Sequence, residues 1–305
     1  MSMKCHLIVV DPQNDFCVGD DGKGHKGSLV VPNALEDMKR VADMIRRIGP
    51  KLDDIHVTLD SHQTIGIERP LWWKRVGDGA HPAPFTVLGI HPDGKRIVRI
   101  DFSTGAPVAT EEEYTTKVPS LLHNGGPVVN PMDPTKRLGS FGYLQTLASK
   151  GRYPHVVWPE HCIVGTWGWS IVEELADALH DWEASQMGRV DYITKGNNPW
   201  TEHFSGVQAE VPDPDDPSTQ VNTGLIQTLE EADIIAITGE ALSHCVASTM
   251  RDISTSFSDP KYVQKMVILT DCMSNVGGFD FLGEAAIKDM QSKGAKLTTS
   301  VDFLA

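Results

Sequence analysis

The chain has 305 residues, a hydrophobic content of 40% and a formal net charge of −14 at pH 7. This length suits one large domain or one domain with a sizeable insertion, and the acidic balance argues against nucleic acid and anionic membranes as partners. No run of 18 apolar residues occurs, so we expect no membrane span. The apolar run near the start is too short for a signal peptide and lacks a cleavage-type tail, so we expect none. Five scattered cysteines without a Cys-x-x-Cys pair suit reduced thiols in the cytoplasm better than a disulfide framework.

Short apolar runs alternate with amphipathic stretches along most of the chain. The runs that predict strands are 6–11, 53–60, 190–196, 232–240, 265–273 and a last short one at 295–300. Apolar residues at helical spacing predict helices over 29–49, about 245–254 and 284–294. This alternation predicts an α/β fold in which helices cover both faces of a parallel sheet.

Residues 63–154 break this alternation. The segment is rich in proline, glycine and turn signals, with weak strand-like runs at 85–90 and 95–101. We interpret it as an insertion packed beside the sheet, serving as a lid or as an oligomer contact. The predicted organisation is therefore a single domain over 1–305 with an insertion at about 63–154.

Ionisable residues follow four of the predicted strands. The first strand ends at Asp11, the second at Asp60, the third at Lys195, and the fourth leads into a turn that contains Cys245. Ligands of open parallel sheets bind beyond the carboxyl ends of the strands. We therefore expect these four side chains to meet at one edge of the sheet.

Each of these residues also has an ordinary structural explanation. An aspartate after a strand is common in turns, and a cysteine is often a small buried hydrophobe. Their convergence favours chemistry, because a helix N-terminus and Lys195 would both favour the thiolate of Cys245. The carboxylate of Asp11 could take the thiol proton and pass it to a leaving amine. His244 is expected to point elsewhere, as a sequence neighbour at a helix start usually does.

A second group combines Asp60 and His62 with the distant His161. Asp60 and His62 lie two residues apart, so a strand presents them on the same side, whereas His161 follows 99 residues after His62. Two histidines and a carboxylate suit Zn²⁺, Fe²⁺ or Mn²⁺. On spacing alone, an ordinary packed histidine remains the favoured explanation of His161.

Five short motifs follow one another along the chain. They are VVDPQNDF (9–16), LDSH (59–62), WPEHC followed by GT (158–166), ITKG (193–196) and GEALSHCVAST (239–249). They occur in the order found in the isochorismatase-like cysteine hydrolases, and the chain resembles their nicotinamidase-like branch. The resemblance covers about 4–62 and 155–300 and implies a three-layer α/β/α Rossmann-like sandwich around a six-stranded, mostly parallel sheet.

The resemblance also implies catalytic roles for individual residues. Cys245 would be the nucleophile, Asp11 the general base and Lys195 the third member of the triad. A cis peptide bond would join Glu240 to Ala241, and the N–H groups of Ala241 and Cys245 would form the oxyanion hole.

By the same resemblance, Asp60, His62 and His161 would hold a divalent metal, Zn²⁺ first, with Fe²⁺ or Mn²⁺ as alternatives. Aromatic residues would hold the pyridine ring of a substrate. The matching positions are Phe16, Trp158 and Phe204, the last of these two residues further from the lysine than is usual.

The activity that this resemblance implies is hydrolysis of a small aromatic carboxamide, such as nicotinamide, to the acid and ammonia through a cysteine thioester. The partners would be the small amide substrate and further copies of the chain. Leu-Ser stands before His244 where Thr-Asp is common, and the insertion is longer than usual. An isochorismatase-like or carbamoyl/ureido amide hydrolase, and a catalytically silent binding protein on the same fold, therefore stay open.

Overall fold

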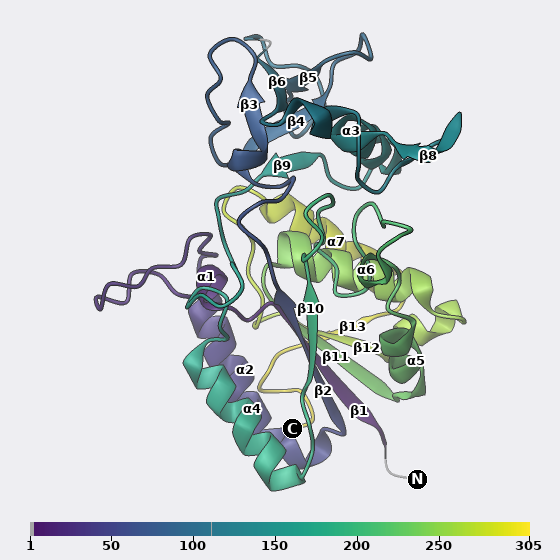
Figure 1. Ribbon diagram of the computed structural model, residues 1–305. Coiled ribbons are helices and arrows are strands. Elements are labelled where there is room, and N and C mark those ends of the chain that lie inside the picture. The colour runs from purple at the N-terminus through teal and green to yellow at the C-terminus, as the bar shows by residue number, and fades with distance from the viewer. Residues whose placement is uncertain (1–2, 111) are drawn as a thin grey trace.

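A six-stranded parallel sheet forms the centre of the larger part of the computed structural model, which describes residues 3–110 and 112–305 (Figure 1). The strand order is β10-β2-β1-β11-β12-β13, and every neighbouring pair is parallel. The strands are β1 (Cys5–Val10), β2 (Asp54–Asp60), β10 (Asp191–Lys195), β11 (Ile234–Gly239), β12 (Met266–Leu269) and β13 (Lys296–Thr298). The predicted α/β class and parallel sheet are confirmed.

Helices cover both faces of this sheet, as Figure 1 shows. One face carries α1 (Asn14–Cys17), α2 (Ala34–Ile48) and α4 (Glu173–Gln186), and the other carries α5 (Thr223–Glu231), α6 (Ala247–Ser256) and α7 (Asp280–Ser292). Short 3-10 helices span Gly49–Lys51, Pro70–Trp72, Pro119–Leu122, Pro217–Thr219 and Pro260–Lys265. The sequence analysis did not identify α4 and α5.

Helix α2 shows how the spacing of apolar residues determines which face of a helix is buried. Its buried residues Met38, Val41, Ala42 and Ile45 follow the helical spacing that buries one face against the sheet. The predicted start at residue 29 is wrong by five residues, because Asn33 before the helix takes a left-handed backbone conformation with φ 70°.

Residues of the predicted insertion form a second, antiparallel sheet together with β9, which follows directly after it. Its order is β3-β6-β5-β4-β9, beside α3 (Gly139–Lys150) and the pair β7 (Val129–Asn130) and β8 (Asp133–Arg137). The strands are β3 (Trp73–Arg75), β4 (Thr86–Ile90), β5 (Ile97–Arg99), β6 (Glu113–Thr116) and β9 (His155–Val157). The two weak strand-like runs correspond to β4 and β5. The division into one domain with an insertion stays a prediction.

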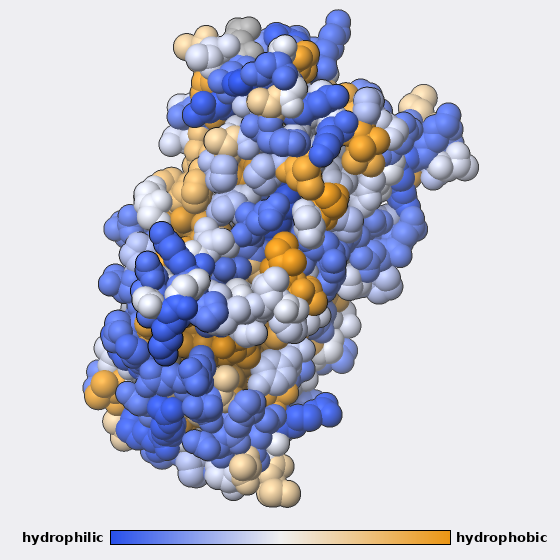
Figure 2. Space-filling model, turned by 60° about the vertical axis from the view of Figure 1, so that its left-hand side comes forward, coloured by the Kyte–Doolittle hydropathy of each residue, from blue (hydrophilic) through white to orange (hydrophobic). Residues whose placement is uncertain are grey.

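The surface agrees with the acidic, polar composition. Hydrophilic residues cover most of the face shown in Figure 2, with small hydrophobic patches between them. Among the residues that the structure describes, no helix has the length and apolar character needed to cross a bilayer.

The topology of the parallel sheet identifies one preferred binding position. From β1 the chain moves to β2 on one side, whereas from β11 it moves to β12 on the other side. Ligands bind at the carboxyl ends of strands where the order reverses in this way. Asp11 follows β1 and Cys245 lies in the turn after β11, so both stand at this position.

Candidate active site

Lys195 brings the predicted strand-end residues together. It ends β10 with only 2% of its surface exposed. Its Nζ lies 2.8 Å from Asp11 Oδ2, 3.1 Å from Asp60 Oδ1 and 3.8 Å from Cys245 Sγ. The carbonyl oxygen of His203 accepts a further hydrogen bond from Nζ at 3.1 Å. A sulfur, two carboxylates and an ammonium from separate strands therefore share one buried site.

Asp11 is fully buried and held by its neighbour Thr58 on β2. The Thr58 hydroxyl donates to Asp11 Oδ1 at 2.6 Å, and the Asp11 N–H donates to both the carbonyl and hydroxyl oxygens of Thr58 at 3.1 Å. The other carboxylate oxygen faces Lys195. Burial raises the pKa of Asp11 while Lys195 opposes the rise, and the net direction is upward. Such a carboxylate is a stronger base than one in water.

Cys245 lies in a π-helical turn, Leu242–Val246, between β11 and α6. Burial raises the pKa of its thiol well above the ordinary value, although the nearby Lys195 lowers it. Lys195 favours the thiolate, as expected, but desolvation is the larger effect and the net pKa shift of the thiol is upward. The sulfur needs a proton acceptor before it can attack. The Asp11 carboxylate is the candidate, because it contacts the same Lys195 ammonium as the thiol.

The turn before Cys245 carries the backbone features that the resemblance implies. The peptide bond Glu240–Ala241 is cis. The Ala241 N–H makes no hydrogen bond to any described residue, and both Ala241 and Cys245 line the same pocket. The assignment of their N–H groups as an oxyanion hole stays a prediction.

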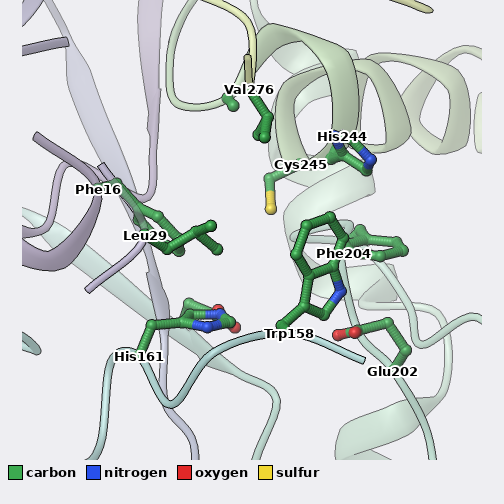
Figure 3. A pocket seen from close by; sticks show the side chains of 11 residues that line it. Phe16, Leu29, Trp158, His161, Glu202, Phe204, His244, Cys245 and Val276 are labelled. Carbon is green, nitrogen blue, oxygen red and sulfur yellow. The ribbon is translucent and has the colours of Figure 1, made fainter. Parts of the chain in front are cut away.

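The pocket in front of Cys245 is mainly aromatic (Figure 3). Phe16, Trp158 and Phe204, the three predicted substrate contacts, all line it, and the sulfur of Cys245 points into it. Small-molecule sites are lined mainly by hydrophobic and aromatic side chains, so this aromatic lining suits a compact, flat ligand.

Two further ionisable residues line this pocket and did not emerge as site residues from the sequence. His244 forms part of the wall, but its ring points away from the sulfur of Cys245, as expected (Figure 3), and burial lowers its pKa to about 3 and keeps it neutral. Glu202 lies across the pocket (Figure 3). Burial, together with the Glu68 carboxylate, raises the pKa of Glu202 to about 7, and its Oε2 has no hydrogen-bond partner among the described residues.

Asp60, His62 and His161 form the one group in the described part of the chain that could hold a metal ion. Asp60 Oδ2 lies 2.9 Å from His62 Nε2 and 3.2 Å from His161 Nε2. One ligand atom from each residue lies within 4.8 Å of the others, and all three side chains are buried. The structure thus brings together residues that are 99 positions apart in sequence.

The surroundings of these three residues fit a divalent cation. His62 Nδ1 faces Glu68 Oε1 at 3.2 Å, the carboxylate–histidine arrangement that orients metal ligands. Burial alone would lower the pKa of His62, but the Asp60 carboxylate raises it to about 9, so a metal that binds here would displace a proton from this ring. Burial and Arg69 lower the pKa of His161 to about 4, which leaves the neutral imidazole that ligates metals.

The segment after β1 positions this cluster. The Gln13 side chain donates to the carbonyl oxygen of Asp60 and accepts from the Asp60 N–H, both at 2.7 Å. The Asp15 carboxylate accepts from the Cys162 N–H at 2.6 Å, next to His161. The motif VVDPQNDF therefore holds both halves of the candidate metal site as well as supplying Asp11.

Four supporting residues were missed by sequence reasoning: Thr58, Glu68, Arg69 and Glu202. Thr58 could have been found, because it alternates with Asp60 along one strand. Arg69 pairs with Glu68 at 3.1 Å and donates to the carbonyl oxygens of Pro159 and His161 at 2.7 and 2.8 Å. No local sequence pattern predicts these contacts of Arg69, because they depend on where the chain returns from the insertion to the main sheet.

Comparison with known proteins shows the fold. No family model and no curated protein matches the chain. The yeast nicotinamidase is 17% identical, with 96% of this chain and 99% of that chain covered and a TM-score of 0.56. The Acinetobacter baumanii nicotinamidase/pyrazinamidase is 18% identical, with 99% of this chain and 98% of that chain covered and a TM-score of 0.56. The Pyrococcus horikoshii pyrazinamidase in complex with zinc is also 18% identical, with 97% of this chain and 99% of that chain covered and a TM-score of 0.51. The chain therefore shares the isochorismatase-like fold of these enzymes, as its motifs predicted.

Proposed function

We propose that this protein is a cysteine hydrolase that cleaves a small aromatic carboxamide, with nicotinamide as the first candidate, to the acid and ammonia. The observation that carries the proposal is the position of Lys195 between Asp11 and Cys245, together with the place of Cys245 in the wall of an aromatic pocket. The names of the structures that share the fold, nicotinamidase and pyrazinamidase, support an aromatic amide as substrate.

The acylation step uses groups that stand within the buried site. Asp11 takes the thiol proton of Cys245 as the sulfur attacks the amide carbonyl carbon. The negative charge that develops on the carbonyl oxygen is stabilised by the N–H groups of Ala241 and Cys245, and each such donor typically contributes about 3 kcal/mol. Ammonia leaves with the proton held by Asp11, and an acyl thioester remains on Cys245.

The deacylation step returns the site to its starting state. Asp11, again a carboxylate, takes a proton from water as the water attacks the thioester, and the thiolate leaves and is reprotonated. Lys195 keeps Asp11 ionised between the two steps, because its ammonium lies 2.8 Å from the carboxylate. Phe16, Trp158 and Phe204 hold the ring and exclude bulk water.

A divalent metal, Zn²⁺ first, fits the site formed by Asp60, His62 and His161. When bound, it would supply a Lewis acid that orients or polarises a polar group of the substrate. The Pyrococcus structure in complex with zinc supports this choice of metal.

The decisive experiment measures ammonia release from nicotinamide by the purified, zinc-supplemented protein and by Cys245→Ala. Cys272→Ala is the matched control, because Cys272 is also buried but lies outside the pocket. We expect activity in the wild type and Cys272→Ala and none in Cys245→Ala. Activity that survives in Cys245→Ala would refute the mechanism.

A substrate panel separates the alternatives that share this chemistry. A folded, metal-loaded protein that ignores nicotinamide but releases ammonia from another carboxamide or a carbamoyl compound would refute nicotinamide as the substrate. A protein inactive on the whole panel, with a Cys245 that iodoacetamide does not modify, would instead be a binding protein on this fold.

A further inference from the structure

A groove lies outside the active-site pocket, between the end of α3, α6 and α7. The segment 151–153, which leads from α3 towards β9, lines one side, and α6 and α7 line the other. Its empty volume is about 890 Å³, and it is open to solvent. Ala286 and Met290 form an apolar floor on α7, while Arg152 and Arg251 reach the groove from opposite sides.

Arg152 is braced by two buried carboxylates. Its Nε lies 3.4 Å from Glu210 Oε2 and its Nη1 lies 3.0 Å from Asp252 Oδ1. Both acids are almost fully buried, and neither lines the groove. The remaining nitrogen, Nη2, is buried and has no hydrogen-bond partner within the described residues. The two acids therefore orient the guanidinium and leave one end of it free.

Arg251, on α6, presents a second free donor. Its Nη1 is buried without a hydrogen-bond partner, and Arg251 forms no ion pair with any residue that the structure describes. Buried donors of native proteins are almost always satisfied by protein, water or ligand. Arg152 and Arg251 line the same groove with unpaired N–H groups, and guanidinium groups match carboxylate and phosphate geometry.

The charge balance of the groove favours an anion. Arg152, Arg251 and the adjacent Lys150, whose Nζ donates to the Glu210 carbonyl oxygen at 2.6 Å, supply three cations. Glu210 and Asp252 oppose them, and burial raises the pKa of Glu210 to about 7, so its charge is incomplete at neutral pH. Among the described residues, the one acid on the groove wall itself is Asp289, which is paired with Lys293 at 2.7 Å. This positive region contrasts with the net charge of −14 of the whole chain.

We propose that this groove binds a small molecule carrying a carboxylate or phosphate group, held by Arg152 and Arg251 against the apolar floor of α7. The bound anion adjoins the active-site wall. Tyr153 lines the groove, its hydroxyl donates to the Ser243 carbonyl oxygen at 3.0 Å, and its ring stacks on His244 with centroids 5.3 Å apart. His244 lines the pocket in front of Cys245, so the ligand acts as an effector of that site.

Isothermal titration calorimetry of the full chain with inorganic phosphate and with succinate, each at matched ionic strength in chloride, tests the anion site. The variant is Arg251→Gln, which removes a charge without breaking an ion pair among the described residues. Arg189→Gln, an exposed arginine just before the amino end of β10, is the matched control.

Saturable binding of either anion to the wild type and Arg189→Gln, weakened at least tenfold in Arg251→Gln, supports the site and identifies which oxyanion it prefers. Absence of saturable binding of both anions, or equal affinity in Arg251→Gln, overturns it. These outcomes do not depend on the proposed catalysis. The effector role is measured by the rate at which iodoacetamide modifies Cys245: a saturating anion should change this rate in the wild type but not in Arg251→Gln, and an unchanged rate overturns that role.

Discussion

Lys195 is the buried cation on which two carboxylates depend, and Lys195→Met tests that dependence directly. Its Nζ contacts Asp11 Oδ2 at 2.8 Å and Asp60 Oδ1 at 3.1 Å, and all three residues are buried. Burial alone would lower the pKa of Lys195, but the two carboxylates raise it well above the ordinary value. Methionine keeps the unbranched shape of the side chain, is one atom shorter, and lacks the charge and the hydrogen-bond donors.

The expected loss of unfolding free energy is large. Removing one partner of a buried ion pair typically costs about 3–5 kcal/mol, because the other charge remains desolvated and unpaired. That is a substantial part of the ~5–15 kcal/mol by which folded domains are usually stable. Adding Asp11→Asn removes one of the orphaned charges. The double variant Asp11→Asn/Lys195→Met is therefore expected to be more stable than Lys195→Met alone.

Urea denaturation followed by circular dichroism measures these differences. EDTA is included throughout, so that metal binding does not add to the stability. Lys39→Met is the matched control, because the pair of Lys39 with Glu36 is largely exposed and should contribute little. A Lys195→Met protein as stable as this control, or a double variant less stable than Lys195→Met, would refute the electrostatic account of the site.

Three other variants test the surroundings of the site. Glu68→Gln removes the carboxylate that faces a candidate metal histidine, and competition with a fluorescent chelator should show zinc affinity about 10–100-fold weaker. Gly196→Ala adds a Cβ 2.9 Å from Asp60 Oδ1 at φ +82°, so we expect a loss of ~1–3 kcal/mol and weaker zinc binding. Its control is Gly77→Ala, where a Cβ meets nothing within 4 Å; equal effects would contradict the close approach. Because burial raises the pKa of Glu210 from 4.5 to about 7, the native state holds a proton that the unfolded chain loses between those values. Stability should therefore fall by up to about 1.4 kcal/mol per pH unit as pH rises from about 5 to 7. Urea titrations across this range should show a shallower fall in Glu210→Gln, and an unchanged slope would contradict the assignment.

The main sheet was predictable because its strands are buried on both faces. All six residues of β1 are buried, and β11 is buried over five of its six residues, so both read as continuous apolar runs. The second sheet could be predicted only in part from the sequence. Its β9 has three residues and its β3 begins with Trp73, and strands this short carry too little pattern to be distinguished from loops.

The sequence predicts the site residues that follow strands, because the carboxyl ends of parallel strands lie at one edge of the sheet. It does not predict the site residues that only tertiary contacts bring to the pocket. Asp11, Lys195 and Cys245 follow strands whose carboxyl ends must meet, so their proximity follows from the order of elements. The protonation state of Cys245 could not be predicted, because it depends on how completely the site excludes water. Glu202 faces the pocket only through the path of an irregular loop, and no periodicity marks it.

The position of the insertion explains why the candidate metal ligands are so far apart in sequence. The chain leaves the sheet after Asp60 and His62 and returns through β9 shortly before His161. Arg69, near the start of the insertion, donates to the carbonyl oxygens of Pro159 and His161 near its end, so the two ends are fastened together. The entropic cost of closing a loop rises only slowly with its length. A long segment can therefore be inserted at this point without moving the three ligands, provided that the contacts of Arg69 at its base are kept.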